Sequence, residues 1–122
     1  MMKRRETGIL GEKLACEFLG NNGYRIIEKN FRCTDGEADI IAQHQDTLVF
    51  VEVRTKSSRQ FGSPEESITP IKMEHLRNVA AHYCQSHSNL PESWRIDVIA
   101  IEMNSHGRVS RIELIENAIG DA

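Results

Sequence analysis

Apolar positions recur with two different periods along the chain, and these periods divide it into helices and strands. A helical period covers residues 8–21, and a second helix is predicted over residues 70–86, after Thr69 as N-cap and Pro70 as first helical residue. Extended patterns predict five strands, at residues 24–32, 37–44, 47–55, 94–103 and 110–117. The order of helix, three strands, helix and two strands is typical of an α/β domain whose mixed sheet carries helices on its faces.

Two neighbouring strands carry carboxylates at positions where buried strands normally carry valine or isoleucine. Asp39 interrupts the apolar run ADIIA, and Glu52 interrupts the run LVFVEV. The polar turn Gln45-Asp46 joins the two strands, which predicts an antiparallel hairpin. Because an unpaired buried carboxylate is strongly destabilising, each acid needs either a hydrogen-bonding partner or a metal.

The phase of this hairpin is expected to place Asp39 and Glu52 on one face of the sheet, close enough to share one divalent ion. Mg²⁺ suits such a pair, because it accepts one or two carboxylates and completes its shell with water and phosphate oxygens. Arg54 follows on the same face, where it would neutralise charge developing on a phosphate. The alternative is that both acids are structural and are bonded to Arg54 and to backbone amides.

The same residues resemble the PD-(D/E)xK signature of restriction-endonuclease-like nucleases: Asp39, then Glu52-Val53-Arg54 with arginine in the lysine position. The blocks GEKLACEFLGNNGYRIIEKNFR, GEADIIA and LVFVEVRTK, followed by K-x-x-x-L-x-x-x-A, are similar to the uncharacterised bacterial YraN family over about residues 8–102. This resemblance implies a restriction-endonuclease-like αβββαβ core, in which helices flank a mixed central sheet.

The resemblance also implies roles for individual residues. Asp39 and Glu52 would be the metal ligands, for Mg²⁺ or Mn²⁺, and Arg54 would stand in for the catalytic lysine. Glu12 matches an additional helix glutamate of the Holliday-junction resolvases in this superfamily. Lys72 lies on the helix where RecB-type nucleases place a supporting polar residue. Arginine can clamp a phosphate but does not transfer protons, because its guanidinium stays protonated, so Arg54 is not expected to act as a proton-transfer group.

Positive charge is concentrated in two places, although the formal net charge of the chain is -3. One is Lys3-Arg4-Arg5, and the other follows the acidic strand. The candidate nucleic-acid contacts are Arg54, Lys56, Arg59 and Lys72. The net charge argues against a protein that coats nucleic acid, whereas a local basic patch is compatible with a phosphate-facing site.

Simpler roles stay open for each of these side chains. Glu12 could pair with a neighbouring lysine, and Lys72 could extend to water from the start of its helix. Arg54 could form a salt bridge with one of the two acids. Lys56 could be a solvated residue at the end of its strand.

The cysteines and histidines show no metal-binding spacing. Cys16, Cys33 and Cys84 are odd in number, far apart and in no CxxC arrangement, so we expect neither a disulfide framework nor a zinc site. The five histidines are scattered and are interpreted as surface residues. No apolar run has transmembrane length and no signal peptide is evident, which predicts a cytoplasmic protein without a membrane partner.

A chain of 122 residues is expected to form a single nuclease-like domain over residues 1–122. The first hypothesis is a metal-dependent nuclease, a candidate Mg²⁺-dependent endonuclease, that acts on DNA and favours branched or structured substrates. The alternative is a non-catalytic nucleic-acid-binding or adaptor module that retains the nuclease fold, and a third is a protein-interaction domain with internally paired acids. A homodimer would suit a symmetric junction, although no sequence feature indicates one.

Overall fold

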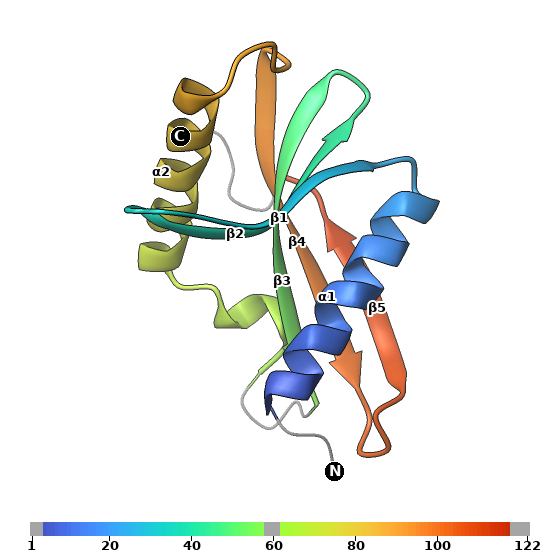
Figure 1. Cartoon of the computed structure of the whole chain (residues 1–122). Helices are drawn as coiled ribbons and strands as arrows, with labels where there is room; N and C mark the ends of the chain where they lie inside the picture. The colour runs from blue at the N-terminus through green and yellow to red at the C-terminus, as the bar shows by residue number, and fades with distance from the viewer. Residues whose placement is uncertain (1–3, 58–61, 118–122) are drawn as a thin grey trace.

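A computed structural model of the chain describes residues 4–57 and 62–117, so Arg59 lies outside the described residues. Figure 1 shows the elements in their order along the chain. They are α1 (Arg4–Asn21), β1 (Arg25–Cys33), β2 (Gly36–His44), β3 (Thr47–Lys56), the 3-10 turn η1 (Glu65–Ser67), α2 (Pro70–Ser86), β4 (Ser93–Met103) and β5 (Val109–Ile115). The predicted αβββαβ core is confirmed, and β5 follows it.

The five strands form one mixed sheet in the order β1-β2-β3-β4-β5. The pairs β1–β2, β2–β3 and β4–β5 are antiparallel, whereas β3 and β4 are parallel. A parallel pair needs a crossover connection, and α2 provides it between β3 and β4. The apolar strand β3 therefore lies at the centre of the sheet, and β5 forms one edge.

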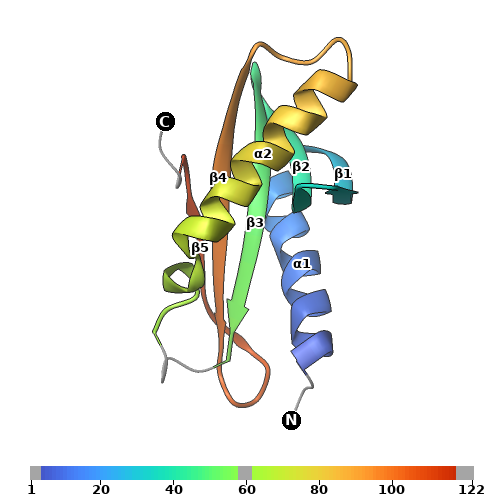
Figure 2. The same cartoon turned by 90° about the vertical axis from the view of Figure 1, so that its left-hand side faces the viewer.

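Alternate side chains of β3 belong to two separate cores, one under each helix. Val49 and Val51 pack with Ala15 of α1, whereas Leu48 and Phe50 pack against α2. Figure 2 shows α2 lying across one face of the sheet and α1 on the other. Because each face buries one of the two alternating sets, a shift of β3 by one residue would exchange the two cores, and this fixes its register.

The helix boundaries differ in how well the sequence predicts them. Helix α2 begins at Pro70 as predicted, because Thr69 caps it: the Thr69 hydroxyl accepts the backbone N–H of Lys72 at 3.1 Å. Helix α1 begins at Arg4, four residues before the predicted start, because the polar residues of its first turn contain no helix breaker and give no apolar period. Neither described helix combines the length and apolarity needed to cross a membrane.

Helix α1 approaches the end of β3 very closely at Gly11. A methyl group added at Gly11 would overlap the side-chain hydroxyl of Thr55, so only glycine permits this packing without a local shift. The next residue, Glu12, is half-buried. The close contact therefore positions α1 so that Glu12 lies near the C-terminal half of β3.

Candidate functional site

The candidate site forms where β2 separates from β3. Pairing between these strands ends at Ile40 and Val51, whereas β3 continues to Lys56 beside β4. The Asp39 carboxylate accepts the backbone N–H of Val53 at 2.8 Å. A side-chain oxygen thus satisfies a strand donor that the backbone of β2 does not reach. This local departure from regular pairing brings Asp39 to the end of β3.

Glu52 lies close enough to Asp39 for the two carboxyl groups to interact. Only 5% of the Glu52 surface is exposed. Burial, followed by the bond to Asp39 and its negative charge, raises the pKa of Glu52 from 4.5 to about 8, although the positive charges of Lys72 and Arg54 act in the opposite direction. In the absence of a further cation, the pair therefore retains a proton near neutral pH.

Lys72 reaches the acid pair from the first turn of α2. Its Nζ lies 3.4 Å from Oε2 of Glu52, which is an ion-pair distance. The same oxygen is buried and has no hydrogen-bond partner among the described residues. The ion-pair distance and the missing hydrogen bond are compatible, because the ammonium can lie beside the oxygen without pointing an N–H at it. The positive charge of Lys72 compensates Glu52 without satisfying its oxygen.

Arg54 and Glu12 lie near the acid pair without belonging to it. Within the described part of the chain, Arg54 forms no ion pair with Asp39 or Glu52, and its buried Nε has no hydrogen-bond partner. Oε1 of Glu12 accepts the side-chain amide of Asn30 at 2.9 Å. Among the described residues, Glu12 does not join the two acids in a three-carboxylate cluster. The acidic centre therefore consists of two carboxylates, and Glu12 stands apart from them.

A groove of about 790 Å³ runs along the end of β3, between the start of α1 and the β1–β2 hairpin. Charged side chains of both signs line it: Arg5, Glu12, Glu37, Asp39, Arg54 and Lys56. Glu52 and Lys72 do not line the groove. Because Glu52 contacts Asp39, the acid pair extends from the groove surface into the interior. The structure thus brings the predicted site residues together, except Arg59, which lies outside the described ranges.

Asn30 and Arg5 are groove residues that the sequence did not identify as part of the site. Asn30 has a φ of 55°, a left-handed conformation that asparagine tolerates better than most residues, within strand β1. An asparagine inside a predicted strand was the available signal for this left-handed residue. Arg5 belongs to the basic start of the chain, and its place in the groove depends on the early start of α1.

A second buried acid, Asp97, shows what a structural carboxylate looks like in this fold. It is fully buried in β4, and its oxygens accept the Arg95 guanidinium at 3.0 Å and the backbone N–H of Asn117 at 2.8 Å. The Tyr24 hydroxyl lies 3.5 Å away. Burial, followed by the charge of Asp97, raises the pKa of Tyr24. Asp97 has the partners that Oε2 of Glu52 lacks, which indicates a structural role for Asp97.

Comparison with known proteins places this chain among close relatives. The sequence profile described as "Uncharacterised protein family UPF0102" matches residues 11–101, which include the acid pair. The UPF0102 proteins of Caldicellulosiruptor saccharolyticus and Moorella thermoacetica are 46% and 44% identical over 117 residues, covering 96% of this chain and 99% and 98% of theirs. Among solved structures, Pyrococcus furiosus SfsA in complex with Ca²⁺ has a TM-score of 0.45 and 14% identity, covering 95% of this chain and 64% of that chain.

Proposed function

This chain belongs to the UPF0102 family, the YraN-like family that its sequence resembles, and we propose that it is a metal-dependent nuclease acting on DNA. One observation carries the proposal. The acids Asp39 and Glu52 are in contact, and Oε2 of Glu52 is buried without a hydrogen-bond partner in the described structure. A divalent cation is the chemical group that such a pair lacks, because it would remove the repulsion and satisfy the oxygen.

The donor set fits Mg²⁺ or Mn²⁺. Asp39 and Glu52 offer carboxylate oxygens, which are the ligands that these ions prefer. Asp39 lines the groove, so water and phosphate oxygens have access to the remaining coordination positions. When bound, such an ion supplies a water of lowered pKa and stabilises negative charge on a phosphodiester.

The basic residues of the groove would hold the substrate. Arg54, Lys56 and Arg5 line it and can contact phosphate oxygens without reading bases. Lys72 is paired with Glu52 at 3.4 Å, so its ammonium is held beside the acid pair. Arg54 occupies the position of the motif lysine. Lys72 can supply the positive charge that the lysine provides in that motif.

Branched or structured DNA is the substrate class that we favour, because Glu12 matches the helix glutamate of Holliday-junction resolvases. Glu12 lines the same groove as Asp39, and its carboxylate accepts the side-chain amide of Asn30. A symmetric junction presents two equivalent scissile positions, which a homodimer would match with two grooves.

The second candidate function is a non-catalytic nucleic-acid-binding or adaptor module. The arginine at position 54 favours it, because a guanidinium binds phosphate but does not act as a proton donor or acceptor. In this case the groove would bind DNA through its basic side chains, and the acids would hold an ion without turnover.

We expect the protein to cleave at least one of linear, flapped or four-way DNA in the presence of Mg²⁺ or Mn²⁺. Asp39→Asn should reduce the cleavage rate by at least about 100-fold, because removing one ligand charge weakens both ion binding and its orientation. Glu17→Gln, at an exposed acid of α1, is the matched control and should cleave like the wild type.

Binding of the same DNA panel should weaken with salt, because Arg54 and Lys56 contact phosphates. Salt-sensitive binding without cleavage by the wild type would favour the adaptor module over the nuclease. Absence of both binding and cleavage would contradict both functions and leave the protein-interaction domain.

A further inference from the structure

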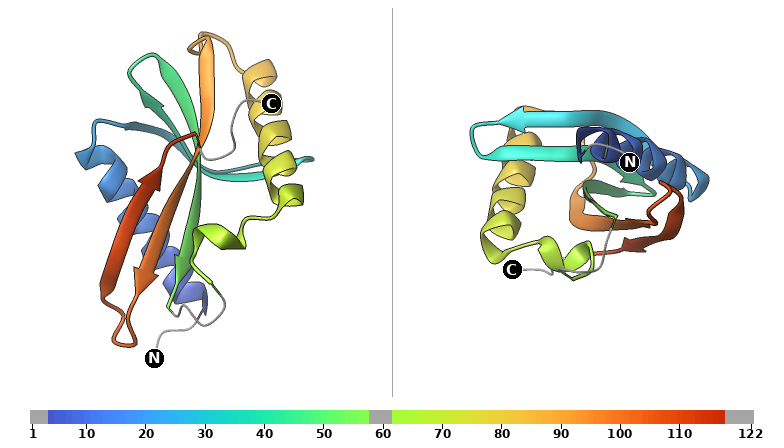
Figure 3. Two further views of the ribbon diagram at one scale, coloured as in Figure 1. Left: turned by 180° about the vertical axis from the view of Figure 1, so that it is seen from behind. Right: turned by 90° about the horizontal axis from the view of Figure 1, so that it is seen from below.

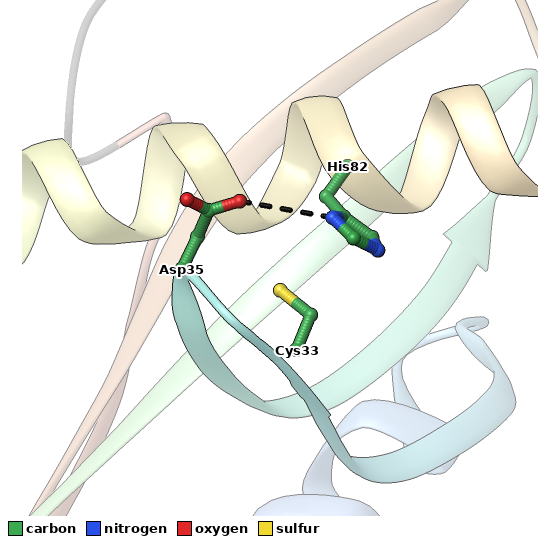
Figure 4. Close-up of side chains that lie close together, drawn as sticks. All are labelled: Cys33, Asp35 and His82. Atoms are coloured by element: carbon green, nitrogen blue, oxygen red, sulfur yellow. Dashed lines mark ion pairs between the residues drawn. The ribbon is translucent and has the colours of Figure 1, made fainter.

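A second group of metal-ligating side chains lies at the turn of the β1–β2 hairpin, against α2. Cys33 ends β1, Asp35 lies in the turn that follows, and His82 lies on α2. The potential ligand atoms of these three residues lie within 4.8 Å of one another. Figure 4 shows the three side chains directed into the same space between the hairpin and the helix. The cluster shares no residue with the groove.

The protein core holds both parts of this cluster in place. Phe31 of β1 makes an edge-to-face contact with Tyr83 of α2, with ring centroids 5.0 Å apart. Cys33 packs against the same core. Gly36 has a φ of 136°, and a methyl group there would lie 3.5 Å from Val79 of α2. Figures 1 and 3 show the hairpin crossing to reach α2. Packing, rather than an ion, therefore sets the relative positions of the three ligands.

The distances are close to those of a tetrahedral site. Nδ1 of His82 lies 3.7 Å from Oδ2 of Asp35, an ion pair when the imidazole is protonated. Zinc bonds of about 2.0–2.3 Å place tetrahedral ligands roughly 3.3–3.8 Å apart, so this pair already has a suitable separation. The largest separation within the cluster, up to 4.8 Å, requires a further approach of about 1 Å, which a change of side-chain rotamer can supply.

The donor set selects the kind of ion. A thiolate, an imidazole and a carboxylate together match Zn²⁺ and other borderline divalent metals, whereas Mg²⁺ and Mn²⁺ favour oxygen ligands. All three residues retain access to solvent: Asp35 is exposed, and Cys33 and His82 are half-buried. Three protein ligands leave a fourth position for water.

We propose that Cys33, Asp35 and His82 form a Zn²⁺ site that joins the β1–β2 hairpin to α2. Binding releases the Cys33 thiol proton to solvent, and the resulting thiolate coordinates the ion. The hairpin carries Asp39, and α2 carries Lys72. Zn²⁺ at this site therefore fixes the two elements that carry the Asp39 carboxylate and the Lys72 ammonium, without entering the groove itself.

Co²⁺ is the probe that tests this site, because its bond to a thiolate gives a charge-transfer absorption that carboxylate sites do not produce. We expect this band when Co²⁺ is added to the reduced wild-type protein, and we expect Zn²⁺ to displace it. Cys33→Ser should abolish the band. His82→Gln should weaken Co²⁺ binding at least about 10-fold, since even indirect partners of a metal ligand are worth about 10–100-fold.

Three matched variants separate this site from other sources of binding. Cys84→Ser removes a half-buried thiol outside the cluster, and His75→Gln removes an exposed histidine of the same helix. Glu52→Gln removes the buried acid of the Asp39–Glu52 pair. All three should retain the band. Absence of the band in the wild type, or its persistence in Cys33→Ser, would overturn the proposal and leave an Asp35–His82 ion pair beside a free thiol.

Discussion

Replacing Glu52 with glutamine is expected to stabilise the metal-free protein by roughly 4 kcal/mol at pH 8, since each unit of a pKa shift is worth about 1.4 kcal/mol. The pKa of Glu52 is raised from 4.5 to about 8 by burial and by Asp39. Between these values the folded protein retains a proton that the unfolded chain releases, so the stability of the wild type falls as pH rises. Glutamine cannot ionise, and its amide can still donate to Asp39 as the protonated acid does.

Urea denaturation at a series of pH values measures this effect. The difference between Glu52→Gln and the wild type should be small near pH 4.5, should grow up to about pH 8 and should level off above it. The control Glu17→Gln, at an exposed acid, should follow the wild type at every pH. Equal stability of the wild type and Glu52→Gln across this window would contradict the raised pKa and the buried charge on which the site depends.

A gain in stability combined with a loss of activity would identify Glu52 as a residue retained for function. Natural proteins tolerate strained or destabilising groups mainly at functional sites. Asp97 supplies the internal comparison, because its carboxylate is bonded to Arg95 and to the backbone of Asn117. Removing the charge of Asp97 should therefore destabilise the protein, the opposite of the effect expected at Glu52.

Replacing Lys72 with alanine is expected to lower metal-dependent DNA cleavage by about 100–1,000-fold, the usual effect of losing one preorganised stabilising group. The Lys72 ammonium lies 3.4 Å from Glu52. Its loss leaves Glu52 without this compensating charge and raises the pKa of Glu52 further, so the pH optimum of residual cleavage should move upward. Lys72→Arg keeps the charge and should retain part of the activity.

Arg54→Lys tests the other candidate for the role of the motif lysine. Lysine in this position can exchange a proton and arginine cannot, so Arg54→Lys should cleave as fast as the wild type or faster. For Lys72→Ala, the control is Lys13→Ala, which removes one positive charge at an exposed lysine of α1 and should leave cleavage unchanged. If Lys72→Ala cleaves like the wild type, Lys72 has only a structural role at Glu52.

The sequence predicts those parts of the fold and site that depend on local pattern. The alternation in β3 predicts two buried faces, and the interruption of that pattern at Glu52 identifies the unusual acid. The capping hydroxyl of Thr69 and the helical Pro70 predict the start of α2. In each case a short stretch of chain contains the complete physical reason for the structure.

Contacts across the fold could not be predicted in this way. The contact of Lys72 with Glu52 depends on how α2 packs over the sheet after its crossover. The spacing of the cysteines gives no sign of the cluster of Cys33, Asp35 and His82, because spacing rules detect ligands that are close in sequence. His82 reaches Cys33 and Asp35 only because the end of the hairpin packs on α2.

The most direct test of the proposed site is a calorimetric titration with Mn²⁺ at pH 8. It is best done in a Cys33→Ser background, so that the second cluster does not contribute. We expect weak binding of one ion, in the micromolar to millimolar range, because two carboxylates supply the protein ligands and water completes the shell. Asp39→Asn and Glu52→Gln should each abolish this binding, whereas Glu17→Gln should retain it. An equal Mn²⁺ response from all four proteins would contradict a metal site at Asp39 and Glu52.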